Sequence, residues 1–210
     1  ESDKLKELEQ QASQSSGSDT GGVTTPSSAG VYLTATTAGE TLVGTERDDI
    51  LVGMGGRNWL EGHGGNDILI GGSYDGRSML GDIASFKGIT TGVYASLATN
   101  LAYVDGKATA MVNVMGLRGG DGNDTLIGNA SSNYLEGGLG DDTLYGAAST
   151  AIDLEDDVAS YMHASGGVTV DLNLTLDVSG AAQYGQPQGT PYGTSAGADG
   201  HDALFGIENL

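Results

Sequence analysis

The sequence predicts an all-β fold, a parallel β-roll or β-solenoid with two related repeat blocks. The first observation is a nine-residue unit with glycine first, Asp or Asn sixth and leucine eighth. The second is a fixed offset that relates three tandem units from Gly44 to three more from Gly119. A short unit repeated in tandem is the signature of stacked repeat architectures. The units cover residues 44–52, 53–61, 62–70, 119–127, 128–136, 137–145 and 197–205.

Each unit combines a turn with a short strand. Glycine is concentrated at positions one, two and four, where the chain must turn with positive φ at low steric cost. The last three residues form a minimal strand with leucine on its apolar face. Two units then make one turn of the solenoid, and successive turns stack as parallel strands about 4.8 Å apart. We expect the eighth-position leucines to fill the space between two facing sheets: Leu51, Leu60, Leu69, Leu126, Leu135, Leu144 and Leu204.

The sixth-position acids predict a metal site between stacked turns. Asp49 and Asp67 lie one turn apart in sequence, and so do Asp124 and Asp142. Two carboxylates about 5 Å apart repel by roughly 3 kcal/mol at an effective dielectric constant near 20. A calcium ion relieves this repulsion because it binds about six to eight oxygens. Zinc prefers Cys or His, and the chain has no cysteine.

The unit resembles the RTX (repeats-in-toxin, hemolysin-type) calcium-binding nonapeptide over roughly residues 40–210. The resemblance implies calcium as cofactor, bound between consecutive loops by Asp side chains and backbone carbonyls. The first implied site takes its ligands from Thr45, Arg47, Asp49, Gly62, Gly64 and Asp67. The second implied site takes its ligands from Gly120, Gly122, Asp124, Gly137, Leu139 and Asp142.

The middle unit of each block carries Asn in place of Asp. A D-x-A-S-aromatic segment follows each block, at 82–86 and 157–161, and resembles the usual end of an RTX block. We therefore expect a second, weaker pair of calcium sites. They join Asn58 with Asp82, and Asn133 with Asp157. The alternative is that the Asn loops merely turn and hold no ion. Asp202, in the seventh unit, is a further candidate ligand.

The chain divides by composition into three segments. Residues 1–30 predict a helix-prone end followed by a Ser/Gly/Thr-rich linker. Residues 31–118 predict the first block with flanking strands. Residues 119–210 predict the second block, with a long loop at 176–196 and a GIENL end that resembles the lead-in to a further block.

Composition restricts the partners. The chain has 28 acidic and 8 basic residues, a net charge of −20, which argues against nucleic acid and anionic membranes as partners. No apolar stretch approaches about 18 residues, so we expect no membrane insertion. A thin core and strong self-repulsion predict a chain that folds poorly without metal. Together with the resemblance, this composition predicts a secreted protein, extracellular or on a bacterial cell surface.

No known catalytic motif is present, and the histidines are far apart in sequence, so we expect no enzymatic activity. The predicted function is calcium binding coupled to folding in a secreted bacterial toxin, adhesin or exoenzyme. The resemblance implies type I secretion machinery as a partner, with the module acting as a folding, secretion and spacer segment. The alternative function is recognition of a polysaccharide, a surface or another protein domain through Trp59 and Tyr134. Both rings hold the seventh position of a middle unit, and the other explanation is that they only cover the strand face.

Overall fold

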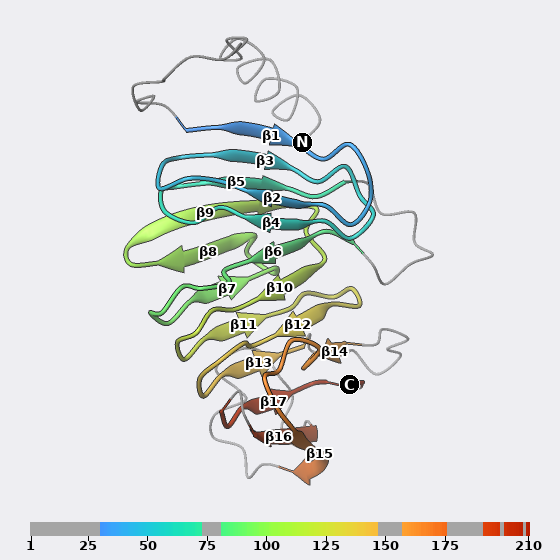
Figure 1. Ribbon diagram of the computed structural model, residues 1–210. Helices are drawn as coiled ribbons and strands as arrows, with labels where there is room; N and C mark the ends of the chain where they lie inside the picture. The colour runs from blue at the N-terminus through green and yellow to red at the C-terminus, as the bar shows by residue number, and fades with distance from the viewer. Residues whose placement is uncertain (1–29, 73–80, 147–156, 176–190, 198–199, 208) are drawn as a thin grey trace.

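The computed structural model describes residues 30–72, 81–146, 157–175, 191–197, 200–207 and 209–210. Every element within these ranges is a β-strand. The described residues therefore contain no helix that is long and apolar enough to cross a membrane. The strands stack from the N-terminal to the C-terminal end as a two-sheet roll (Figure 1). The predicted helix-prone end and linker lie outside the described residues, apart from Gly30.

The roll consists of an eleven-stranded sheet and a six-stranded sheet, here called the wide sheet and the narrow sheet. The wide sheet has the order β1 (Tyr32–Thr34), β3 (Ile50–Val52), β5 (Ile68–Ile70), β9 (Lys107–Val112), β8 (Leu101–Val104), β7 (Tyr94–Ser96), β11 (Thr125–Ile127), β13 (Thr143–Tyr145), β17 (Ala203–Phe205), β16 (Pro191–Gly197) and β15 (Val168–Thr175). The narrow sheet has the order β14 (Val158–Ala159), β12 (Tyr134–Glu136), β10 (Gly116–Arg118), β6 (Ile83–Ser85), β4 (Trp59–Glu61) and β2 (Thr41–Val43).

The strand register confirms the predicted solenoid turn. Tyr32 pairs in parallel with Ile50, and Ile50 pairs in parallel with Ile68, so each turn advances the chain by 18 residues. Because side chains alternate across a strand, this register keeps every eighth-position leucine inside the roll. All seven of these leucines are 0 % exposed. Complete burial stabilises each by roughly 1.5–3 kcal/mol, so they form the core between the sheets.

An antiparallel meander interrupts the roll between the two blocks. β7 pairs with β8 and β8 with β9, and the β8–β9 turn places Asp105 and Gly106 at positive φ. β9 then runs parallel to β5, with Ala110 opposite Ile68. Met111 therefore continues the column of buried leucines and is 1 % exposed. The sequence pattern predicted strands here, but not that β9 would return to the first block.

The second block repeats this topology with β15, β16 and β17 in the places of β7, β8 and β9. β17 runs parallel to β13, while β15 and β16 pair in antiparallel fashion. The prediction of a loop over 176–196 is wrong for 191–196, because Tyr192 pairs with Phe205 and draws this stretch into β16. The remainder, 176–190, lies outside the described residues.

The last residues of the chain hold the place of the lead-in to the second block. Asn209 forms a parallel bridge to Val158, as Gly116 does to Ile83. Residues 205–207 and 209–210 are therefore the structural counterparts of residues 112–114 and 116–117.

Candidate metal centre

Sixth-position aspartates stack along one edge of the roll, and their side chains accept hydrogen bonds from the preceding turn. In the first block, the Val31 backbone N–H donates to Asp49 Oδ1 at 2.6 Å. The Asp49 N–H in turn donates to Asp67 Oδ1 at 2.9 Å. Asp49 and Asp67 thus form a first ladder of two carboxylates, as the sequence predicted from their spacing.

The second block builds a ladder of three carboxylates. The Val93 N–H donates to Asp124 Oδ1 at 2.7 Å, and the Asp124 N–H donates to Asp142 Oδ1 at 2.8 Å. The Asp142 N–H then donates to Asp202 Oδ1 at 3.0 Å. Sequence reasoning named Asp202 as a ligand but missed its neighbour, because the long insertion separates the two units. The signal was the unit pattern itself, which Asp202 shares with Asp142.

The ladder carboxylates are buried, and two of their oxygens have no partner. The Oδ2 atoms of Asp67 and Asp142 are buried without a hydrogen bond. Burial raises the pKa of Asp67 to about 6 and that of Asp124 to about 6. Burial, reinforced by the charges of Asp124 and Asp202, raises the pKa of Asp142 to about 8. The Oδ2 atoms of Asp67 and Asp142 thus lack the donors that would stabilise the ionised form.

Backbone carbonyls converge on the same carboxylates at the first-position glycines. A Cβ added to Gly44 would lie 2.5 Å from Asp49 Oδ2 and 2.7 Å from the Gly62 carbonyl oxygen. At Gly119, the equivalent oxygens come from Asp124 and Gly137. Glycine is required at position one because any side chain would fill the space that these oxygens share.

Four of the remaining predicted carbonyl ligands face the next loop of the stack. The Gly64 N–H donates to the Thr45 carbonyl at 3.2 Å. The Leu139 N–H donates to the Gly120 carbonyl at 3.0 Å. The carbonyls of Arg47 and Gly122 face Gly65 and Gly140 of the following turn. The structure therefore places the carbonyls of Thr45, Arg47, Gly120 and Gly122 beside the following loop.

The donor set fits calcium. Among the residues that the structure describes, no three His, Asp or Glu side chains are grouped to hold a metal ion. An ion at a ladder would therefore depend on carboxylates together with backbone carbonyls, an all-oxygen set. Calcium accepts such mixed oxygen ligands in flexible geometry, whereas zinc prefers nitrogen and sulfur.

Comparison with protein families identifies the repeats that carry these loops. A family model of the RTX calcium-binding nonapeptide repeat matches residues 43–73 and 118–149, with four copies. These segments are RTX calcium-binding repeats. A comparison with curated proteins finds no match to the chain. The RTX repeats thus coincide with the loops that carry Asp49, Asp67, Asp124 and Asp142.

The opposite edge of the RTX repeats brings the Asn residues to their predicted partners. The Asn58 N–H donates to Asp82 Oδ1 at 2.8 Å, and the Asn133 N–H donates to Asp157 Oδ1 at 2.8 Å. The six extra residues before each Asp do not disturb this register. Asp82 nevertheless differs from Asp67 and Asp142, since both of its oxygens accept hydrogen bonds.

Trp59 and Tyr134 lie together on the outer face of the narrow sheet. Their ring centroids are 6.2 Å apart with the rings edge to face, and Gly116 occupies a strand between them. The guanidinium of Arg118 lies 5.6 Å from the centre of the Trp59 ring, and that of Arg57 lies 5.1 Å from the centre of the Tyr134 ring. Each guanidinium therefore lies over one face of an aromatic ring. Polysaccharide recognition by these rings stays a prediction.

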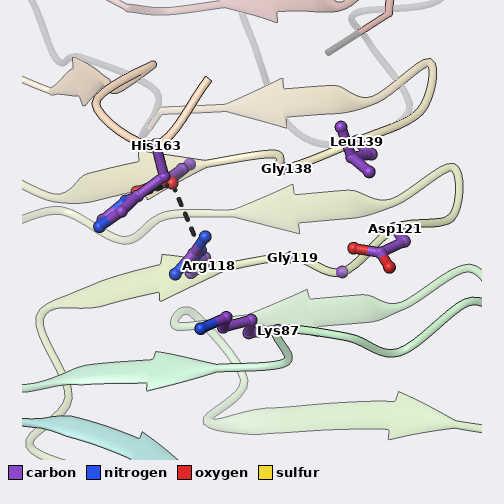
Figure 2. A pocket seen from close by; sticks show the side chains of 9 residues that line it. Lys87, Arg118, Gly119, Asp121, Gly138, Leu139 and His163 are labelled. Carbon is purple, nitrogen blue, oxygen red and sulfur yellow. Dashed lines mark hydrogen bonds and ion pairs between the residues drawn. The ribbon is translucent and has the colours of Figure 1, made fainter. Parts of the chain in front are cut away.

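A small pocket beside this aromatic pair is lined by Lys87, Arg118 and His163 on one side, as Figure 2 shows. Its buried acid, Glu136, lies 3.3 Å from Arg118 Nε and 2.7 Å from His163 Nδ1. The Tyr134 hydroxyl also donates to Glu136 at 2.6 Å. Arg118, His163 and Tyr134 therefore all contact this carboxylate. The contact with His163 fixes the segment around His163 against the narrow sheet.

Proposed function

We propose that this chain is a calcium-dependent β-roll module, in which ions bound at the aspartate ladders make folding favourable. The observation that carries the proposal is the pair of buried, unpartnered oxygens on Asp67 and Asp142. An unpaired buried charge costs several kcal/mol, so the folded chain without metal is poorly stable around these two groups. Bound calcium would supply the missing positive charge.

The proposed ligands are those that the loops bring together. At the first ladder they are Asp49 and Asp67 with the carbonyls of Thr45, Arg47, Gly62 and Gly64. At the second ladder they are Asp124 and Asp142 with the carbonyls of Gly120, Gly122, Gly137 and Leu139. Asp202 adds a further carboxylate beyond Asp142, and we propose an ion between these two residues as well.

The charge of the chain supports a role in secretion. A chain with a net charge of −20 repels itself and stays extended where calcium is scarce. Where calcium is about millimolar, binding would become folding free energy. We therefore propose a module of a secreted toxin, adhesin or exoenzyme that leaves the cell unfolded through type I secretion machinery. Outside, the folded roll would act as a spacer through binding and folding, without catalysis.

The test is a calorimetric calcium titration of the wild-type chain, Asp67→Asn and Asp48→Asn. Both substitutions remove one negative charge from the same loop region, but only Asp67 belongs to a ladder. Asp48 is exposed and accepts its hydrogen bond from the Asn66 N–H, which an amide oxygen can also do. We expect Asp67→Asn to weaken calcium binding roughly 10- to 100-fold and Asp48→Asn to leave it near wild type. Equal affinities for all three chains would refute the ladder assignment.

A further inference from the structure

The loop that precedes β4 closes around the side chain of Asn58. The Asn58 Nδ2 donates to the Gly55 carbonyl at 2.9 Å, to Asp82 Oδ1 at 2.9 Å, and to the carbonyl of Gly53. Its Oδ1 accepts a hydrogen bond from the Glu40 N–H at 2.8 Å. Because an amide oxygen cannot donate, the Glu40 contact fixes the orientation, with the NH₂ group facing the three oxygens.

These oxygens, two glycine carbonyls and one Asp carboxylate, are of the same chemical types as the proposed calcium ligands. Gly53 and Gly55 hold positions one and three of their unit. Gly62 and Gly64 hold the same two positions in the next unit and are proposed ligands at the first ladder. In the Asn58 loop, a neutral donor group faces two such carbonyls and a carboxylate.

The backbone of this loop differs from that of the aspartate loops. Residues 54–57 all have positive φ: Met54 at 63°, Gly55 at 88°, Gly56 at 96° and Arg57 at 63°. In the loop that leads to Asp67, only His63 and Gly65 are in this region. Two non-glycine residues in a left-handed conformation need contacts that hold them there. The hydrogen bonds of the Asn58 amide supply such contacts from inside the loop.

The carboxylate at this edge already has its donors. Asp82 Oδ1 accepts from the Asn58 N–H and Nδ2, and Asp82 Oδ2 accepts from the N–H groups of Gly55 at 2.8 Å and Gly72 at 2.7 Å. The Oδ2 atoms of Asp67 and Asp142, in contrast, have no partner. Neither oxygen of Asp82 therefore lacks a hydrogen-bond donor that a cation would have to replace.

We propose that the carboxamide of Asn58 takes the place of a calcium ion in this loop, so that the Asn edge of the first block folds without metal. This inference rests on the proposed function, since it assigns calcium to the aspartate ladders. It also revises the expectation that Asn58 and Asp82 form a weak calcium site. In the first block, one edge is closed by a side chain and the other by ions.

The test compares the number of calcium ions bound by the wild-type chain, Asn58→Asp and the control Asn100→Asp. Both substitutions exchange an amide for a carboxylate, but Asn100 lies in the exposed β7–β8 turn. A carboxylate at position 58 would face three oxygens and need a cation. We expect Asn58→Asp to bind one ion more than wild type, and Asn100→Asp to bind the same number.

Trp59 reports where the additional ion binds. It is the single tryptophan of the chain and follows Asn58 directly. Terbium, used as a calcium substitute and excited through tryptophan, should give stronger emission in Asn58→Asp than in wild type. Unchanged stoichiometry and emission in a folded Asn58→Asp chain would overturn the proposal.

A second variant covers the case in which Asn58→Asp does not fold. Asn58→Ala removes the amide, so we expect lower thermal stability of the calcium-loaded chain but the same number of bound ions. Loss of one ion in Asn58→Ala would show that the wild-type loop holds calcium and would overturn the proposal. The calcium titration of Asp67→Asn described above distinguishes a failure of this proposal from a failure of the proposed function. If wild type binds no calcium, the proposed function fails, and the Asn58 proposal fails with it unless Asn58→Asp gains an ion.

Discussion

The backbone N–H of Asp142 donates a 3.0 Å hydrogen bond to Oδ1 of Asp202, across a separation of 60 residues. This contact gives the second block a third carboxylate, whereas the first block has two. Thr109 holds the place of Asp202 in the first block. Thr109 precedes Ala110, the first β9 residue that pairs with β5, just as Asp202 precedes the first β17 residue that pairs with β13. The Tyr161 hydroxyl donates to Asp202 Oδ2 at 3.0 Å. Phe86 is the counterpart of Tyr161 in the first block and has no hydroxyl. The acid and its donor therefore occur together in one block and are both absent from the other.

Asp202→Thr gives the second block the residue of the first. We expect it to remove one bound calcium ion and to lower the stability of the calcium-loaded chain by about 1–3 kcal/mol, because a ladder carboxylate is lost. Calorimetric stoichiometry and thermal unfolding in calcium measure both effects. The control is Asp141→Asn, an exposed neighbour of the same charge. Unchanged stoichiometry in Asp202→Thr would remove this residue from the ligand set.

Gly137→Ala tests the space that the ladder oxygens share. A Cβ at this position would collide with Asp142 Oδ2. We expect weaker calcium binding and a loss of roughly 1–3 kcal/mol in the free energy of unfolding. Gly167→Ala is the control, since a Cβ there meets nothing within 4 Å. Equal behaviour of the two variants in calcium titration and urea unfolding would contradict the proposed geometry.

Leu126→Ala tests the core. Leu126 is 0 % exposed and packs between the two sheets, so its truncation should cost about 2–5 kcal/mol in calcium. Leu139→Ala should cost little, because Leu139 is 41 % exposed. Leu139 is proposed to ligate through its carbonyl, which the substitution retains, so calcium affinity should also be unchanged. A large loss of affinity in Leu139→Ala would point to a role for the side chain instead.

The aspartate ladder predicts opposite effects of pH with and without calcium. The pKa of Asp142 rises from its ordinary value of 3.8 to about 8 in the folded chain without metal, chiefly through burial. A raised folded-state pKa contributes stability below about pH 4, and this contribution is lost as pH rises through about 8. The calcium-free chain should therefore have its strongest β-sheet signal in far-UV circular dichroism at about pH 5 and lose that signal as the pH rises to about 8. Calcium competes with these protons, so calcium affinity should fall on acidification. A calcium-free chain that becomes more stable with rising pH would contradict this prediction.

The repeat units predicted the part of the fold that depends on local periodicity. The positions of Leu51 and Leu126 in the core, the turn of 18 residues and the stacking of Asp49 on Asp67 all follow from one unit and its spacing. The place of β9 beside β5 could not be predicted, because residues 107–112 carry no repeat pattern and pair over a long separation. The Asn58 contacts were missed for another reason. The sequence alone does not show how the Asn58 amide is oriented. Only the hydrogen bond from the Glu40 N–H to Asn58 Oδ1 shows that the NH₂ group faces the loop.

The central claim is that calcium at the ladders makes the roll fold, and far-UV circular dichroism during a calcium titration tests it most directly. The wild-type chain starts in chelator, and magnesium serves as the control because it prefers a tighter octahedron and keeps its waters. We expect little β-sheet signal without calcium, a cooperative gain at about millimolar calcium or below, and no gain with magnesium. A full β-sheet signal in strong chelator would show that the roll forms without metal and would contradict calcium-coupled folding.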